Sequence, residues 1–248
     1  MLVTDLDGTL LKDDKTISRE TIAALEICRK SGIKLVYATG RGGTAKYMVP
    51  SDFFDAGITQ NGGVIHLGEK LIGSIFISHK TSMSFLLACT KRGLKATSES
   101  EGIHFSNFDC QKEWPGSGIP FKIVDFNSHD LDAEKLYVII NNDEEERFVV
   151  NNLPDELYLS LARDGLGMIM HREATKGRAV EKLAALWKID RSEIVAFGDD
   201  INDIDMLTYA GMGIAMSNAV EEVKASTAFV CPSNKEDGIA QWIKEKLL

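Results

Sequence analysis

Short, almost entirely apolar runs alternate with helix-like segments at both ends of this chain, and this alternation restricts its fold more than any other feature. The clearest runs are residues 34–38 and 194–197. Strands with this composition are buried on both faces, as in parallel sheets. Amphipathic segments such as 176–187 lie beside them in the sequence. The alternation predicts an α/β fold with a doubly wound, parallel, Rossmann-like sheet.

The alternation is interrupted in the middle of the chain. Residues 81–172 contain shorter and more polar segments with little long periodicity. Within them we predict helices at 83–91 and 144–152 and strands at 135–140, 157–162 and 168–171. We therefore expect a core domain built from residues 1–80 plus 173–248, with an inserted α+β cap domain at 81–172. A chain of 248 residues is long enough for two domains of this size.

Composition excludes several classes of protein. The chain has 28 Lys+Arg against 37 Asp+Glu, which argues against a nucleic-acid binder because such proteins carry a basic stripe. No apolar run approaches the ~18 residues of a membrane helix, and the first residues do not resemble a secretory signal. The four cysteines form no Cys-x-x-Cys pair. We expect them to be core residues in a reducing compartment, which predicts a cytoplasmic protein with no membrane partner.

Three predicted strands end in polar residues and glycine, at 5–9 (DLDGT), 39–41 (TGR) and 198–203 (GDDIND). In an open α/β sheet such ends meet at the edge where ligands bind. Several carboxylates would then lie close together and would need a compensating cation. Oxygen ligands without Cys or His select a hard cation, Mg²⁺ first. Asp200 is equally well explained as the N-cap of the helix predicted at 201–210.

Lys176 is unusual for its predicted position in the first turn of a helix. The helix dipole disfavours a cation there by about 0.3–1 kcal/mol. Gly177 costs up to roughly 1 kcal/mol more than alanine would. Local conflicts of this kind often mark functional sites. An ammonium beside free helix N–H groups would bind an anion such as phosphate, whereas the alternative is a solvated surface lysine.

Four segments taken in order resemble the motifs of the haloacid dehalogenase superfamily. They are DLDGT at 5–9, ATGR at 38–41, TKG at 175–177 and GDDIND at 198–203. The segments at 213–219 and 234–240 are similar to those of Cof-type phosphatases of subfamily IIB. The large insert between the second and third motifs resembles the α/β cap of that subfamily.

The resemblance implies a Mg²⁺-dependent phosphatase that hydrolyses small phosphoesters, sugar phosphates first, through an aspartyl-phosphate. It makes Asp5 the nucleophile and Asp7 the general acid and base. The metal-binding residues that it implies are Asp5, Asp7 (through its backbone carbonyl), Asp199 and, in a supporting role, Asp203. The phosphate-binding residues that it implies are Thr39, Gly40, Lys176 and Asn202.

Two other functions are compatible with the same motifs. One is a phosphomutase of this fold, and the other is a non-catalytic, phosphate-responsive binding module in which Asp5 keeps its phosphate. Two further residues are ambiguous in the sequence. Asn61 could face the substrate or only form a turn, and Arg41 could be structural.

Overall fold

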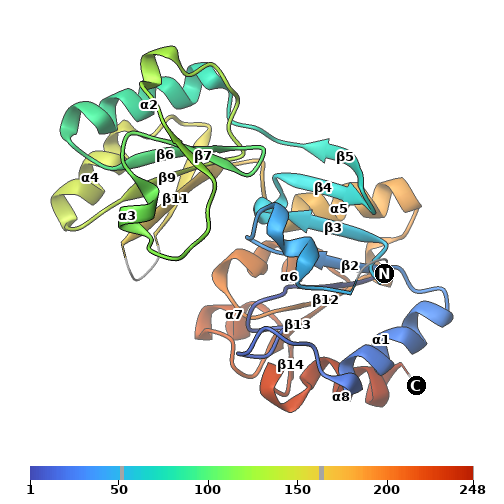
Figure 1. The fold of residues 1–248 in the computed structure, drawn as a ribbon. Coiled ribbons are helices and arrows are strands. Elements are labelled where there is room, and N and C mark those ends of the chain that lie inside the picture. The colour runs from blue at the N-terminus through green and yellow to red at the C-terminus, as the bar shows by residue number, and fades with distance from the viewer. Residues whose placement is uncertain (51–52, 162–164, 248) are drawn as a thin grey trace. The chain divides into compact units, whose positions relative to one another are not determined.

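The computed structural model describes residues 1–50, 53–161 and 165–247. The chain divides into two compact units, shown in Figure 1. The core unit is Met1–Ser74 with Ala174–Leu248, and the inserted unit is Ile75–Glu173. Residues 75–80 and Glu173, which we expect in the core domain, belong to the inserted unit. For residues 75–80 the reason is that the Ile77 and Ala133 backbones exchange two hydrogen bonds of 2.7 and 2.8 Å, and helix α2 (His79–Arg92) begins directly afterwards.

The core unit contains an eight-stranded sheet in the order β14-β13-β12-β1-β2-β3-β4-β5. The strands from β14 to β3 pair in parallel, whereas β4 and β5 form an antiparallel hairpin at one edge. The predicted α/β class with a parallel Rossmann-like sheet is confirmed. The strand bounds are β1 Leu2–Thr4, β2 Leu35–Ala38, β3 Ala56–Thr59, β4 Val64–Leu67, β5 Lys70–Ser74, β12 Val195–Gly198, β13 Met212–Met216 and β14 Phe229–Cys231.

The helices of the core unit follow local sequence signals. Helix α1 begins after Ser18, whose hydroxyl accepts a hydrogen bond from the Thr21 N–H at 3.0 Å and so caps the first turn. The helix predicted at 201–210 is divided into a 3₁₀ turn at Ile201–Asp203 and α6. In the eight-stranded sheet, β1, β2 and β12 are almost completely buried. The helix bounds are α1 Arg19–Lys30, α5 Lys176–Trp187, α6 Ile204–Tyr209, α7 Glu221–Ser226 and α8 Gly238–Lys246.

The inserted unit contains a six-stranded sheet in the order β10-β11-β9-β6-β7-β8. Its hydrophobic core includes side chains of α2 and α4 packed on this sheet. The helices predicted at 83–91 and 144–152 and the strands predicted at 135–140, 157–162 and 168–171 are present, with Ala162 outside the described residues. The bounds are β6 Ala96–Ser100, β7 Ile103–Ser106, α3 Cys110–Glu113, β8 Phe121–Ile123, β9 Lys135–Ile139, α4 Asp143–Asn152, β10 Leu157–Leu161 and β11 Leu166–His171.

Strands β6, β7 and β8 were not predicted, because β6 (ATSES) is polar and β7 and β8 are only four and three residues long. Glu99 of β6 is nevertheless buried, and its Oε2 accepts a hydrogen bond of 2.7 Å from the Tyr137 hydroxyl of β9. Lys135 lies opposite Glu99 in the strand register and is also buried. Buried polar groups need partners of this kind. In β6, buried polar residues with partners stand where a strand is normally recognised by alternating apolar residues.

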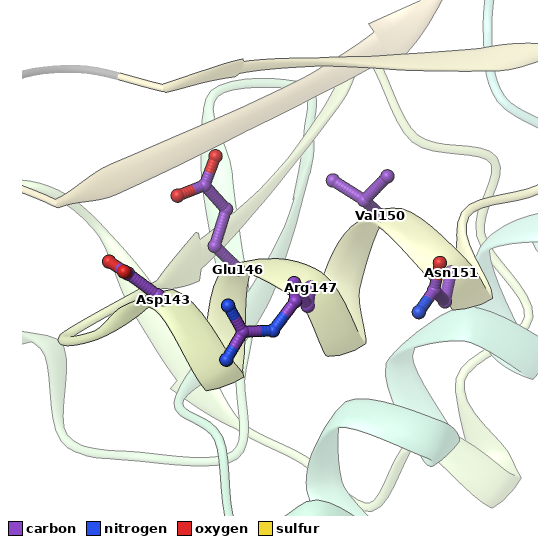
Figure 2. Close-up of a pocket in the computed structure, with 5 residues that line it drawn as sticks. All are labelled: Asp143, Glu146, Arg147, Val150 and Asn151. Atoms are coloured by element: carbon purple, nitrogen blue, oxygen red, sulfur yellow. The ribbon is translucent and has the colours of Figure 1, made fainter.

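The inserted unit has a pocket on the surface of α4. Figure 2 shows the side chains that line it, which include Glu146, Arg147 and Val150. None of the predicted site residues is among them.

In the described part of the chain, no helix combines the length and the apolar character that crossing a membrane requires.

Candidate active site

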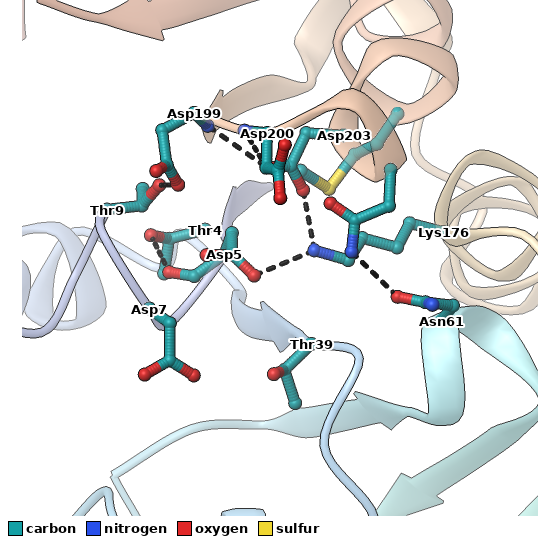
Figure 3. Close-up of polar contacts among 12 residues, drawn as sticks. Thr4, Asp5, Asp7, Thr9, Thr39, Asn61, Lys176, Asp199, Asp200 and Asp203 are labelled. Atoms are coloured by element: carbon teal, nitrogen blue, oxygen red, sulfur yellow. Dashed lines mark hydrogen bonds and ion pairs between the residues drawn. The ribbon is translucent and has the colours of Figure 1, made fainter. Parts of the chain in front are cut away.

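The three predicted strand ends converge because their strands are neighbours. In the sheet, β1 lies between β2 and β12, and Thr4 pairs in register with Tyr37 on one side and Phe197 on the other. The residues that follow these positions therefore emerge at one edge. Figure 3 shows Asp5, Thr39 and Asp199 there, together with Lys176 from the start of α5.

Lys176 is the centre of this arrangement. Its Nζ donates hydrogen bonds to Asp5 Oδ1 at 2.7 Å and to Asp203 Oδ1 at 2.6 Å. The Lys176 and Asp203 side chains have 0% exposure, and that of Asp5 has 8%. A solvated surface lysine is therefore excluded. A fully buried ammonium must be paired, and this one joins the first, third and fourth motifs.

Burial and charge act against each other in this triad. Burial raises the pKa of Asp5 to about 8, although the Lys176 ammonium acts to lower it. Burial alone would lower the pKa of Lys176, but the charges of Asp203 and Asp5 outweigh this effect and raise it. Lys176 therefore stays charged and is shared between two carboxylates. When both carboxylates are ionised, the triad has an excess of negative charge in a place where water cannot screen it.

Asp199 adds a third carboxylate beside the triad. Its Oδ1 accepts a hydrogen bond of 2.6 Å from Thr9 Oγ1, and burial raises its pKa to about 6. Asp5, Asp199 and Asp203 each offer an oxygen within 4.8 Å of the others. Three carboxylates and one ammonium sum to two negative charges, which matches a divalent cation. With only oxygen donors present, the group fits a hard cation such as Mg²⁺.

Two glycines allow the loops to close around these carboxylates. Gly8 has a φ of +82°, and a Cβ on it would lie 2.1 Å from Asp199 Oδ2. A Cβ on Gly198 would lie 2.5 Å from the Asp203 Cβ. Larger residues would therefore displace the carboxylates themselves.

Asp203 is held from two directions. Its Oδ2 accepts hydrogen bonds from the backbone N–H groups of Asp199 at 2.9 Å and Asp200 at 3.1 Å, while its Oδ1 binds Lys176. Asp200 itself is an N-cap, since its Oδ1 accepts from the Ile201 N–H at 2.8 Å. The helix-cap alternative for Asp200 is thus the one that the structure supports.

Asp7 is placed differently from the other carboxylates. Its side chain is not part of the Asp5, Asp199 and Asp203 group, and Figure 3 shows its carboxylate pointing away from them. Its Oδ1 accepts from Lys15 Nζ and from Arg41 Nη2, both at 2.7 Å, and Arg41 Nε donates to its Oδ2. The hydrogen bonds from Arg41 lower the pKa of Asp7 to about 2.

The sequence did not indicate these two partners of Asp7. From the sequence alone Arg41 could be structural, although its place in the second motif is a usable signal for a role in the site. Lys15 gave no signal, because it lies in a turn between β1 and α1 whose geometry the sequence does not reveal.

Thr39, Gly40 and Asn202 meet around Asn61. Asn202 Nδ2 donates to Asn61 Oδ1 at 2.8 Å, and the Asn61 N–H donates to the Thr39 carbonyl at 3.0 Å. A Cβ on Gly40 would lie 2.9 Å from Asn61 Oδ1. Asn61 adopts a left-handed conformation with φ of 54°. It is therefore more than a turn residue, because it links the loops of the second and fourth motifs.

The start of α5 differs from our expectation of free N–H groups. The Gly177 N–H donates to Asp205 Oδ2 at 2.8 Å, and the Arg178 N–H donates to Thr175 Oγ1 at 3.3 Å. Gly177 is explained by packing, because its Cβ would lie 2.9 Å from the Asp205 carbonyl oxygen. For binding an anion, this helix start contributes the Lys176 ammonium rather than these two backbone groups.

The two tail segments support the loop after β1. Asn218 Nδ2 donates to the Gly8 carbonyl at 2.8 Å, and Asn218 Oδ1 accepts from the Asn234 N–H at 3.2 Å. The buried Asn234 side chain donates to the Leu11 carbonyl at 2.8 Å. These contacts hold the backbone at the end of the first motif, at Gly8, and just after it, at Leu11.

A family model described as haloacid dehalogenase-like hydrolase matches residues 2–243. The chain belongs to this family. A 5-amino-6-(5-phospho-D-ribitylamino)uracil phosphatase of Bacillus subtilis, YwtE, is 30% identical, with 98% of this chain and 96% of the relative covered. The phosphatase YwpJ of the same organism is 28% identical, with 100% and 99% covered.

Solved structures agree with this family. The HAD subclass IIB sugar phosphatase BT4131 is similar to this hydrolase at 27% identity with a TM-score of 0.80, covering 98% of this chain and 97% of that one. The resemblance that the motifs indicated, to the Cof-type subfamily IIB phosphatases of this superfamily, is confirmed.

Proposed function

We propose that this hydrolase is a Mg²⁺-dependent phosphatase of small phosphorylated metabolites, and that it works through an aspartyl-phosphate on Asp5. The observation that carries the proposal is the buried Lys176 ammonium, bonded to Asp5 and Asp203 with Asp199 beside them. A nucleophile that is itself an anion must approach an anionic phosphate. The reaction therefore requires positive charge beside Asp5, where the Lys176 ammonium lies.

The metal would be held by Asp5 and Asp199, with the backbone carbonyl of Asp7 as a further ligand. Asp203 supports the site, because both of its oxygens already accept hydrogen bonds. When bound, Mg²⁺ supplies charge neutralisation for Asp5 and for the oxygens of the phosphoryl group.

The remaining chemistry belongs to this chain's own side chains. Lys176 orients Asp5 by binding its Oδ1, and we assign the third N–H donor of the ammonium to a phosphoryl oxygen. An Asp5 carboxylate oxygen attacks phosphorus, and the bond from phosphorus to the leaving oxygen breaks. Asp7 must first leave the hydrogen bonds that lower its pKa to about 2 and take up a proton. Its carboxyl group then gives that proton to the leaving oxygen, which departs as an alcohol.

The second step reverses the role of Asp7. A water molecule attacks phosphorus, Asp7 accepts its proton, and the bond between phosphorus and Asp5 breaks. Phosphate leaves, and the Asp5 carboxylate is regenerated. Thr39, Gly40 and Asn202, gathered around Asn61, would hold the phosphate during both steps.

The substrate class is a phosphate ester of a polyhydroxylated alcohol, with sugar phosphates first. One relative is named for a 5-phospho-D-ribityl substrate and a solved neighbour is named a sugar phosphatase, and both names describe phosphate on such a carbon chain. The four cysteines are unpaired and buried, which supports a reducing compartment, the cytoplasm.

Release of inorganic phosphate from hexose phosphates tests this proposal directly. We expect turnover with Mg²⁺, reversible loss on adding EDTA, and no turnover by Asp5→Asn. Asp13→Asn is the matched control, since Asp13 is an exposed carboxylate whose partner Lys235 lies outside the site. Full activity of Asp5→Asn, or full activity in EDTA, would overturn the mechanism. A product that keeps its phosphate would indicate a mutase instead.

A further inference from the structure

We propose that Arg41 and Lys15 form a clamp that holds Asp7 withdrawn from the reacting group in the free enzyme. Release of Asp7 from this clamp then controls how well the enzyme expels leaving groups that need a proton. This inference rests on the proposed function and gives Arg41 and Lys15 positioning roles in it; neither the motifs nor the names of the relatives assign these roles.

The clamp makes three charge-assisted hydrogen bonds to one carboxylate. Arg41 contacts both Asp7 oxygens through Nε and Nη2, and Lys15 Nζ shares Oδ1 with Arg41 Nη2. A forked guanidinium contact of this kind fixes the plane of a carboxylate as well as its position. The orientation of the Asp7 side chain is therefore determined by the clamp.

Both cations are anchored through their backbones. The Arg41 N–H donates to Thr39 Oγ1 at 3.2 Å, and its carbonyl accepts from the Gln60 N–H at 2.9 Å. The Lys15 N–H donates to the Lys12 carbonyl at 2.9 Å, which closes a turn. Their side chains therefore start from fixed points on either side of Asp7.

The held position of Asp7 is not the one that the reaction needs. Figure 3 shows the Asp7 carboxylate directed away from Asp5 and Lys176, where the phosphorus must be attacked. The side chains of Arg41, Asp7 and Lys15 are 36%, 34% and 49% exposed, respectively. Ion pairs this exposed exchange readily and are weakened by salt. Asp7 can therefore leave the clamp, but only by giving up these contacts.

The cost of releasing Asp7 can be measured by comparing substrates whose leaving groups differ in their need for a proton. An alkoxide is a poor leaving group, so hydrolysis of a sugar phosphate needs the proton from Asp7 as the bond from phosphorus to oxygen breaks. A p-nitrophenolate leaves as a stable anion and needs no proton. Both substrates are dianions, so a general change in electrostatic attraction affects them equally. A change in how readily Asp7 delivers its proton alters the ratio of their kcat/KM values, whereas a uniform change in attraction does not.

The test compares kcat/KM for glucose 6-phosphate with kcat/KM for p-nitrophenyl phosphate. We expect Lys15→Met to raise this ratio by about twofold to fivefold, the range for loss of an exposed ion pair. Arg41→Lys should raise it too, because lysine cannot make the forked contact. Raising the NaCl concentration should raise the ratio in the wild type, and less so in Lys15→Met.

Lys12→Met is the matched control. It removes the same charge from the same turn, but Lys12 pairs with Asp237 rather than with Asp7. Its ratio should equal that of the wild type. If Lys15→Met and Arg41→Lys leave the ratio unchanged or lower it while the wild type hydrolyses both substrates, the clamp is refuted and the proposed function stands. If the wild type hydrolyses neither substrate, the proposed function itself fails.

Discussion

Replacing Lys176 with methionine tests the central ion pair through stability alone. Methionine has a similar length and can be buried, so the change mainly removes the ammonium that binds Asp5 and Asp203. Removing one partner of a buried ion pair costs about 3–5 kcal/mol, because the other partner is left uncompensated. Here two carboxylates lose their partner, so we expect a loss of unfolding free energy in this range. The loss should be greater at pH 9 than at pH 6, because burial already raises the pKa of Asp5 to about 8 and protonation can relieve the repulsion at lower pH.

Urea unfolding in EDTA measures this loss. A Trp114→Phe background removes the tryptophan of the inserted unit and leaves Trp187 and Trp242, so fluorescence reports on the core unit. Lys182→Met is the control on the same helix. Lys182 is exposed on α5, so its replacement should change the unfolding free energy by no more than about 0.5 kcal/mol. An unfolding free energy for Lys176→Met within about 1 kcal/mol of the wild type would refute the buried ion pair.

Two further predictions concern the carboxylates beside this lysine. In metal-free protein, the folded state keeps protons on Asp5 and Asp199 that the unfolded chain releases, since their pKa values rise from 3.8 to about 8 and about 6. The unfolding free energy should therefore fall as pH rises from about 4 to 8. Because metal binding needs ionised carboxylates, Mg²⁺ should raise Tm more at pH 8 than at pH 5, and an equal or larger effect at pH 5 would contradict this explanation. Gly8→Ala should lose more stability than Gly32→Ala, since both glycines have a φ of +82° but only Gly8 would place its Cβ against Asp199. The shared backbone strain is about 1–2 kcal/mol, so equal losses of Tm would show that the contact is unimportant.

The convergence of the site was predictable because it depends on the parallel sheet. The apolar runs at β2 and β12 indicate strands buried on both faces, and parallel neighbours must end at one edge. That rule brings Asp5, Thr39 and Asp199 together without any knowledge of their side-chain contacts. The roles that the resemblance assigns to them remain predictions for the experiments above.

The details that were missed depend on contacts between distant segments. The two helix N–H groups expected for phosphate are instead bound by Thr175 and Asp205, and the Asp205 contact comes from the packing of α5 on α6. Strand β6 was missed because Glu99 is buried through a partner on β9 rather than through an apolar pattern. Lys15 reaches Asp7 only because a turn brings it there.

Capture of the phosphoryl group on Asp5 tests the central claim most directly. In Asp7→Asn, p-nitrophenyl phosphate can still react with Asp5 because its leaving group needs no proton, whereas hydrolysis of the aspartyl-phosphate lacks its base. Rapid mixing should therefore show a burst of about one nitrophenolate per active site. Borohydride reduction followed by peptide mass spectrometry should then find homoserine at position 5. Absence of a burst, with an unmodified Asp5 in the reduced peptide, would contradict the assignment of Asp5 as the nucleophile.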